Sequence, residues 1–308
     1  MPLDLLVPEL LCASPAGRLR CVERWLSRAD KVRDPARSAT AWLGKAFGLD
    51  PVPVAALEQA ACGVAGGSWM RADPVHLRVE GDALRLHEAA LLSISKEEAS
   101  TLVAMLQSHF AADGIEFHAR TPERWYVRLG AGEAPATTPL DEAAGRNVFG
   151  LIPADAKWRN ALTEAQMLLS AHEVNARREA EGKPPINSIW FWGAGALPAA
   201  RPRTYATVYA NDPLARGLGD WSGARVQALP AGIADIDLER ESESTLAVVS
   251  HTGAELEQRW FGPLARAIDR FDRVRLILPS RGDTLVATLT PSARWRLFRG
   301  SKPLSAYA

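Results

Sequence analysis

Apolar and polar residues follow two different periods along this chain, and each change of period marks a predicted element. Residues 18–29 repeat apolar side chains at helical spacing, and residues 38–62 predict two short helices separated by a DPVP turn. Residues 76–89 instead alternate around Gly81-Asp82, which is typical of a β-hairpin. The first third of the chain therefore predicts helices followed by antiparallel strands.

The middle third continues this mixture. Ser95 and Glu98 have the spacing of a capping box that opens an amphipathic helix ending near residue 113. Residues 124–130 alternate as a strand, and one long helix is predicted over roughly 155–180. After that helix, residues 187–198 predict a strand that runs into a glycine turn.

The two ends of the chain carry short apolar runs that are typical of buried strands. These runs are residues 3–11, 204–211, 224–230, 244–251 and 274–280. A helix predicted over 254–271 separates the last two, and strand–helix–strand order indicates parallel pairing. We therefore expect an α/β fold with a mostly parallel sheet flanked by helices.

Composition narrows the class of protein. The 308 residues include 36 basic and 36 acidic side chains, so no net charge attracts nucleic acid or an anionic membrane surface. No apolar run is long enough to span a bilayer, and Asp4 and Glu9 interrupt the first one, unlike a signal peptide. Three cysteines, Cys12, Cys21 and Cys62, form no C-x-x-C pair and predict free thiols. These features predict a cytoplasmic location.

Asp73 and His76 flank Pro74 and lie close to Arg71, which makes them candidate binding residues. An Asp beside a His can orient an imidazole for acid–base work. The alternative is a capped turn that contains a hydrogen-bonded histidine. Both interpretations stay open at this point.

His172, Asn175 and Arg178 are spaced by three residues, so they are expected on one face of the long helix. Arg offers a two-pronged guanidinium and Asn an amide donor, which together suit a phosphate or carboxylate. The alternative is a polar network that closes the helix against the following loop.

Trp190 and Trp192 alternate with Phe191, which predicts both indoles on one side of a strand, in the core rather than on a stacking platform. Gly193 and Gly195 form a lone G-x-G without a third glycine. That pattern is a poor dinucleotide fingerprint, and we expect a tight backbone turn near a site.

The central block has a distinctive combination of segments. They read WMRADPVHL at 69–77, SISKEEASTLV at 93–103, GIEFHARTPERWYV at 114–127, PLDEAAGRN at 139–147 and MLLSAHEVNARREAEGKPPINSIWFWGAG at 167–195. This combination resembles the RpfE-type family of regulatory proteins over nearly the whole chain. The resemblance implies a regulatory role and no particular reaction.

A more remote resemblance is to the archaeal-type cofactor-independent phosphoglycerate mutases. Their H-P-V-N-x-x-R-x-x-x-G-x-x-P-A-N segment has a counterpart in His172, Val174, Asn175, Arg178, Gly182, Pro185 and Asn187, followed by Gly193 and Gly195. Glu173 replaces the proline that follows the histidine.

The mutase resemblance implies a fold and a ligand site. The fold is similar to the alkaline-phosphatase superfamily, with a degenerate α/β core from 1–64 and 196–308 and a substrate-domain-like α+β module at 65–195. Arg71, Arg124 and Arg178 are expected to converge on one pocket for an anion.

The catalytic half of those mutases has no clear counterpart. Their two divalent metals need clustered Asp and His ligands after three strands. Here the first strand ends in Val7-Pro8-Glu9, the last in Ser280-Arg281, and no second histidine follows His251. We therefore expect no metal, no cofactor and no catalytic residue.

Three functions remain as hypotheses, and one of them is a purely structural interaction protein. The first is a non-catalytic regulatory protein that binds a small phosphate- or carboxylate-bearing ligand or a protein partner. The competing one is an active phosphomutase or phosphatase with relocated ligands, for example His76, His172, His251 and Asp283.

Overall fold

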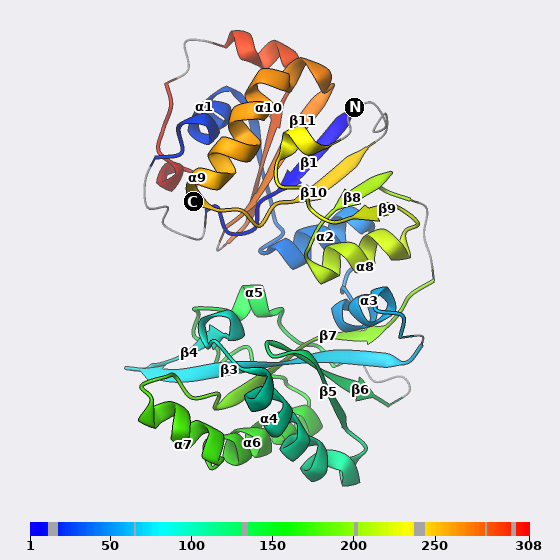
Figure 1. Cartoon of the computed structure of the whole chain (residues 1–308), viewed down its shortest axis with the longest axis vertical. Helices are drawn as coiled ribbons and strands as arrows, with labels where there is room; N and C mark the ends of the chain where they lie inside the picture. Colours follow the sequence, from blue (N-terminus) through cyan, green and yellow to red (C-terminus); the bar gives the residue numbers. More distant parts are fainter. Residues whose placement is uncertain are drawn as a thin grey trace. The chain divides into compact units, whose positions relative to one another are not determined.

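The computed structural model describes residues 1–11, 18–64, 66–130, 135–199, 203–236, 244–280, 282–296 and 300–308. The chain divides into two compact units, drawn in Figure 1: Met1–Asp50 with Ala200–Ala308 (unit 1), and Pro51–Ala199 (unit 2). Cys12 and Arg281 lie outside the described residues, and Cys21 and Cys62 are free thiols.

The expected boundary at residue 65 is displaced. Helix α3 (Val54–Ala61) belongs to unit 2 because it packs against strands β3 and β7 of that unit. Its buried face includes Ala55 and Ala56, which contact Trp69 and Tyr126 of the unit 2 sheet. Apolar packing against strands that are distant in the sequence, rather than the position of the helix in the chain, decides to which unit α3 belongs.

Unit 1 contains a seven-stranded sheet in the order β2-β12-β11-β1-β10-β8-β9. The strands are β1 (Pro2–Leu6), β2 (Asp30–Asp34), β8 (Thr207–Tyr209), β9 (Arg225–Gln227), β10 (Thr245–Val248), β11 (Arg273–Pro279) and β12 (Thr284–Leu289). β11, β1, β10, β8 and β9 run parallel, whereas β12 pairs antiparallel with β11 and β2 pairs antiparallel with β12. The mainly parallel α/β sheet is confirmed.

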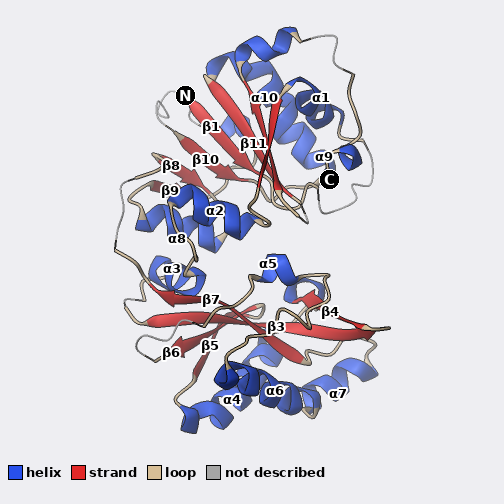
Figure 2. Ribbon diagram, turned by 180° about the vertical axis from the view of Figure 1, so that it is seen from behind, coloured by secondary structure: helices blue, strands red, loops and turns tan. Residues whose placement is uncertain are grey.

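Helices cover both faces of this sheet, as Figure 2 shows. One face carries α1 (Arg20–Arg28) and a continuous helical stretch made of α9 (Gly253–Glu255), the π-helix η4 (Leu256–Phe261) and α10 (Gly262–Ala267). The other face carries α2 (Ala39–Phe47) and α8 (Pro213–Trp221). The wide π-turn precedes Pro263, which has no N–H to donate to the carbonyl of Arg259.

Unit 2 is built on a five-stranded antiparallel sheet. Its strands are β3 (Ser68–Glu80), β4 (Ala83–Glu88), β5 (Glu116–Thr121), β6 (Arg124–Leu129) and β7 (Ser188–Ala196). The long strand β3 pairs with β4 and β6 along one edge and with β7 along the other. The predicted hairpin at Gly81 joins β3 to β4, and Gly81 adopts a φ of 62° there.

Helices also cover both faces of the unit 2 sheet. Figure 2 shows α4 (Lys96–Phe110), α6 (Ala156–Ser170) and α7 (Glu173–Ala180) on one face, with α3 and α5 (Leu140–Ala143) on the other. Alternation along β7 sends Phe191 into the core beside α6, where it meets Trp158 at 5.1 Å between ring centroids. Trp190 and Trp192 are 1% and 7% exposed, so their predicted burial is confirmed.

The prediction of one long helix over 155–180 is wrong. The helix ends at Ser170, and α7 begins anew at Glu173. His172 is the N-cap between them, and its Nδ1 accepts a hydrogen bond from the Val174 N–H. His172 therefore does not share a helical face with Asn175 and Arg178.

Short 3₁₀ turns complete the chain: η1 (Ala89–Leu91), η2 (Ala111–Asp113), η3 (Ile233–Asp235), η5 (Ile268–Arg270), η6 (Pro291–Trp295) and η7 (Leu304–Ala306). Within the described ranges, none of the helices has the length and apolar character needed to cross a membrane.

Candidate functional site

All ten binding residues expected from the sequence lie in unit 2, and two separate polar clusters contain Arg71, Asp73 and Arg178. The first, the Arg71 cluster, consists of Glu58, Arg71, Asp73, Tyr126 and Trp192. Arg71 is 6% exposed, and its Nη1 donates to the two Glu58 carboxylate oxygens at 2.7 and 2.9 Å. Its Nε and Nη2 donate to Asp73 Oδ1 at 3.0 and 2.7 Å.

Two aromatic side chains complete the Arg71 cluster. The guanidinium carbon lies 5.1 Å from the Tyr126 ring centroid and 5.2 Å from that of Trp192, within cation–π range. The Tyr126 hydroxyl donates to Glu58 at 2.7 Å, and the Trp192 indole N–H donates to Asp73 Oδ2 at 2.6 Å. Each carboxylate thus accepts hydrogen bonds from the guanidinium and from one aromatic side chain.

Strand pairing explains why these residues meet. Arg71 and Asp73 are two positions apart on β3, so they project from the same face. Arg71 pairs across the sheet with Tyr126 on one side and Trp192 on the other, which places both rings beside the guanidinium. Glu58 is supplied by α3, which covers this face.

The charge balance of the Arg71 cluster is one guanidinium against two carboxylates. Burial raises the pKa of Asp73, and the shared Arg71 offsets this rise only in part. Burial works against the charged form of Arg71, but Asp73 and Glu58 together raise its pKa. Burial, followed by the neighbouring Glu58, also raises the pKa of Tyr126. Because two carboxyl groups already share the one guanidinium, the cluster has no unpaired cation to offer another anion.

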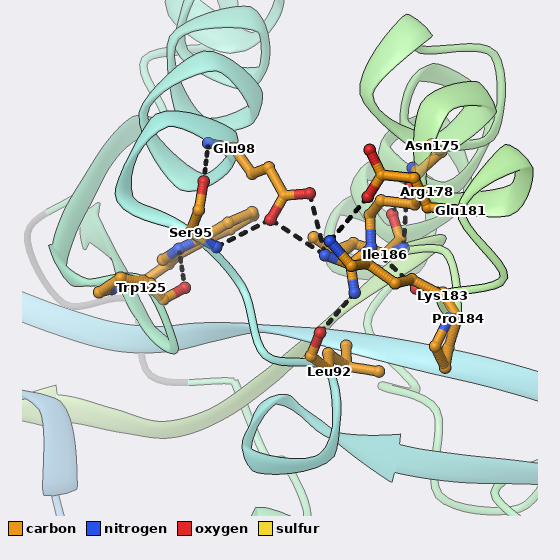
Figure 3. Close-up of polar contacts among 11 residues, drawn as sticks. Leu92, Ser95, Glu98, Trp125, Asn175, Arg178, Glu181, Lys183, Pro184 and Ile186 are labelled. Carbon is orange, nitrogen blue, oxygen red and sulfur yellow. Dashed lines mark hydrogen bonds and ion pairs between the residues drawn. The ribbon is translucent and has the colours of Figure 1, made fainter.

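The second cluster, the Arg178 cluster, joins α7 to the start of α4 (Figure 3). Arg178 is 1% exposed; its Nη1 lies 3.0 Å from both Glu98 carboxylate oxygens, and its Nε donates to the Pro184 carbonyl at 2.9 Å. Its Nη2 donates to the Leu92 carbonyl. Glu98 also completes the capping box, because it accepts from the Ser95 N–H at 2.8 Å.

Asn175 and Asn187 fasten the loop that connects α7 to β7. The Asn175 side chain accepts from the Ile186 N–H at 2.7 Å and donates to the Ile186 carbonyl at 2.8 Å. Asn187 makes the same pair of bonds with the Leu77 backbone, at 2.7 and 2.9 Å. Each side-chain amide thus makes with one residue the pair of backbone hydrogen bonds that a neighbouring strand would make in a sheet.

His76 contacts the same loop. Its Nδ1 lies 2.9 Å from the Pro185 carbonyl, so this nitrogen carries the proton. Burial lowers the pKa of His76, which keeps the ring neutral near pH 7. The His172–Asn187 motif thus forms the network closing a helix against its loop, the second of the two interpretations left open by the sequence.

Gly193 and Gly195 allow α3 to approach β7 closely. A Cβ at Gly193 would lie 2.7 Å from the Cβ of Val54, and a Cβ at Gly195 would lie 2.9 Å from that of Pro53. Both glycines also have positive φ, 62° and 148°. Because neither glycine has a side chain, α3 can pack closely against β7.

The expected convergence of three arginines on one anion pocket is wrong for two of them. Arg71 and Arg178 have separate sets of partners, each with its own carboxylate. Arg124 opens β6 and is half-buried. Ligand binding by the ten residues that the sequence singled out stays a prediction.

Sequence reasoning missed the carboxylates that neutralise these arginines. Glu58 was part of a predicted helix, and Glu98 was assigned only to a cap. The one available signal was the Arg71-x-Asp73 spacing on a predicted strand, which places opposite charges side by side.

Unit 1 contains a different kind of candidate site. A cavity of about 140 Å³ lies at the carboxyl ends of the adjacent parallel strands β1 and β10. In open α/β sheets, ligands bind outside the carboxyl ends of the strands. His251 lines this cavity.

The residues present do not fit a two-metal centre. No three His, Cys, Asp or Glu side chains within the described part of the chain lie close enough together to hold a metal ion. Of the proposed relocated ligands, His76 and His172 are engaged as described above. Asp283 accepts from Arg33 at 2.7 Å and from Ser280 at 2.8 Å.

Comparison with known proteins agrees with the remote resemblance. No family model matches the chain. It is 29% identical over 223 residues, 66% of its length, to the 2,3-bisphosphoglycerate-independent phosphoglycerate mutase of Methanosarcina acetivorans. It is 27% identical over 219 residues to the probable enzyme of that name from Geobacter sulfurreducens. The chain spans about half the length of these relatives, 54% and 55%.

Among solved structures, the PH0037 protein from Pyrococcus horikoshii has a similar fold. The TM-score is 0.50 at 12% identity, over 94% of this chain and 87% of that one. The chain is therefore related, at low identity, to cofactor-independent phosphoglycerate mutases, and it has a mixed α/β fold with a mainly parallel sheet.

Proposed function

We propose that this chain is a non-catalytic, RpfE-type regulatory protein that acts by binding a protein partner. The observation that carries the proposal is the internal pairing of Arg71 and Arg178, each buried against carboxylates of its own unit. Guanidiniums that hold a substrate phosphate must have donors free to reach it. Here the donors of both are directed at groups of the chain itself.

The ends of the unit 1 strands also support a non-catalytic role. Two-metal phosphoryl transfer requires clustered oxygen and imidazole ligands. The residues that follow β1, β10 and β11 in the described chain are mainly Pro8, Ser250, Thr252 and Ser280, with Glu9 and His251 as single candidates. This set favours binding over phosphoryl transfer.

The first test is the reaction itself. The purified full chain is incubated with 3-phosphoglycerate and either Mn²⁺ or Mg²⁺, and formation of 2-phosphoglycerate is followed by ³¹P NMR. We expect none, with a cofactor-independent mutase assayed alongside as the positive control. Metal-dependent conversion would overturn the proposal in favour of the competing enzyme hypothesis.

The second test separates a protein partner from an anionic ligand. We expect the tagged chain, isolated from its own cells, to carry one defined partner at fixed stoichiometry by native mass spectrometry. We also expect no heat of binding when 3-phosphoglycerate is titrated into the chain. Saturable binding of 3-phosphoglycerate that is lost in Arg124→Met but retained in Arg128→Met would contradict the partner proposal and favour an anionic ligand.

A further inference from the structure

Part of the unit 1 cavity is lined by buried apolar side chains. Val7 follows β1 and Val249 follows β10, and they are 3% and 1% exposed. Leu10 and Leu19 add two more apolar side chains to the lining, at 7% and 5% exposure. These side chains belong to the main core of unit 1, so packing fixes this part of the cavity, and the loops that follow β1 and β10 supply the rest of its lining.

The size of the cavity limits its occupant. Its volume of about 140 Å³ is close to that of an apolar protein cavity, roughly 150 Å³, known to accept benzene. A single six-membered ring fits this space, whereas a nucleotide or a peptide side chain with its backbone does not. The walls favour an apolar ring over a sugar or a phosphate.

One polar atom at this cavity has no partner. His251 lines the cavity, and its Nδ1 is buried without a hydrogen bond in the described structure. Trp260 lies against it, with 6.1 Å between ring centroids, and the Trp260 indole N–H is also unpartnered and buried. An unsatisfied buried polar group costs about 1–3 kcal/mol, so a hydrogen-bonding ligand at His251 would remove a real penalty.

The charges at the cavity favour a neutral ligand. Glu9 is among its lining residues, and no Arg or Lys is found among those that the structure describes. A carboxylate among the lining residues disfavours an anion by like-charge repulsion. A hydroxyl, by contrast, can donate to or accept from the imidazole nitrogen whichever tautomer is present.

We infer that this cavity binds a neutral small molecule of the phenol class, with its ring between the valine and leucine side chains and its hydroxyl at His251. The site lies in unit 1 and uses none of the residues on which the proposed partner function rests. The two proposals can therefore fail independently.

The test uses ¹⁹F NMR on the full chain, with 4-fluorophenol as the probe. We expect saturable binding at one site. Fluorobenzene, which has the ring but no hydroxyl, is expected to bind more weakly by on the order of fivefold, the value of one net hydrogen bond. 4-Fluorobenzoate is expected to bind more weakly still because of Glu9.

Two variants make the test specific. Val249→Phe fills the cavity and is expected to abolish binding of both neutral probes. His251→Leu keeps the walls, so 4-fluorophenol and fluorobenzene should bind it with equal affinity. If Val249→Phe does not fold, as judged by circular dichroism, the His251→Leu comparison still decides the question.

Three results would overturn the inference: no saturable binding of 4-fluorophenol to the wild type, unchanged binding to a folded Val249→Phe, or tighter binding of 4-fluorobenzoate than of 4-fluorophenol. None of them would alter the outcome of the phosphoglycerate assay, which tests the other proposal.

Discussion

Two regions of the molecule, the arginine clusters of unit 2 and the cavity of unit 1, differ in whether their buried polar groups have partners. In unit 2, the Arg71 and Arg178 clusters pair each guanidinium with carboxylates and carbonyls of the same unit. In unit 1, His251 Nδ1 at the cavity and Nε1 of the neighbouring Trp260 have no hydrogen-bond partner. Polar side chains in a recognisable motif can thus serve the fold, while an apolar cavity with one unpartnered atom is the better candidate for a ligand.

The largest effect is expected from Arg71→Met. This change leaves Glu58 and Asp73 buried without their shared cation, which costs about 3–5 kcal/mol of unfolding free energy. Urea denaturation measures it, with Arg128→Met, an exposed arginine of the same sheet, as the control at about 0.5 kcal/mol or less. Equal losses in the two variants would show that the Arg71 cluster does not stabilise unit 2.

Arg178→Met is expected to cost somewhat less, about 3 kcal/mol, because Glu98 is partly exposed and regains water. Arg177 is the matched control, since it lies next to Arg178 on α7 and is exposed. A similar urea midpoint for Arg177→Met and Arg178→Met would contradict the role of Arg178 in fastening α7 to α4.

Gly193→Ala tests the close contact between α3 and β7. We expect a loss of about 2–3 kcal/mol, because the new Cβ overlaps Val54 and the residue has positive φ. Gly182→Ala is the control: its φ is similar, 70°, but no atom lies within 4 Å of the added Cβ. Thermal unfolding that shifts equally in both variants would mean that backbone strain alone, and not packing, requires glycine at 193.

Asp73→Asn is expected to change the pH dependence of stability. The folded state raises the pKa of Asp73, so its stabilising contribution is complete below about pH 3.9 and is lost as pH rises through the folded pKa. The unfolding free energy of the wild type should therefore decline relative to that of Asp73→Asn as pH is raised from about 4. A difference that stays constant with pH would mean that Arg71 fully compensates both carboxylates.

No loss of stability is expected from His251→Leu in unit 1. Removing a buried polar atom that has no partner relieves its desolvation penalty, so the unfolding free energy should stay the same or rise by up to about 1–3 kcal/mol. A loss of several kcal/mol in urea denaturation would show that His251 makes a stabilising interaction, and the contrast between the cavity and the two arginine clusters would disappear.

The sequence by itself determined the elements that depend on neighbouring residues. The capping box at Ser95 and Glu98, the turn at Gly81 and the alternation of Trp190, Phe191 and Trp192 were all predicted and are present. Each of these features is decided within about four residues, by hydrogen bonds to the local backbone or by the period of a strand. Local chemistry of this kind is visible in a sequence.

Only the tertiary structure decided the edges of the unit 1 sheet and the break between α6 and α7. Strand β2, with the sequence DKVRD, has almost no apolar pattern because it is an exposed edge. The break at His172 depends on hydrogen bonds from Asn175 and Arg178 to a loop that lies beyond the helix. Neither feature produces a repeat of apolar and polar residues that could be recognised in a single sequence.

The partners of Arg71 and Arg178 were also decided only in three dimensions. Arg71 meets Glu58 across 13 residues of sequence, and Arg178 meets Glu98 across 80. A guanidinium written in a sequence looks the same whether it will meet an external phosphate or a carboxylate of its own chain. Which of the two it meets depends on strand register and on helix packing, because only these bring distant charges within hydrogen-bond distance.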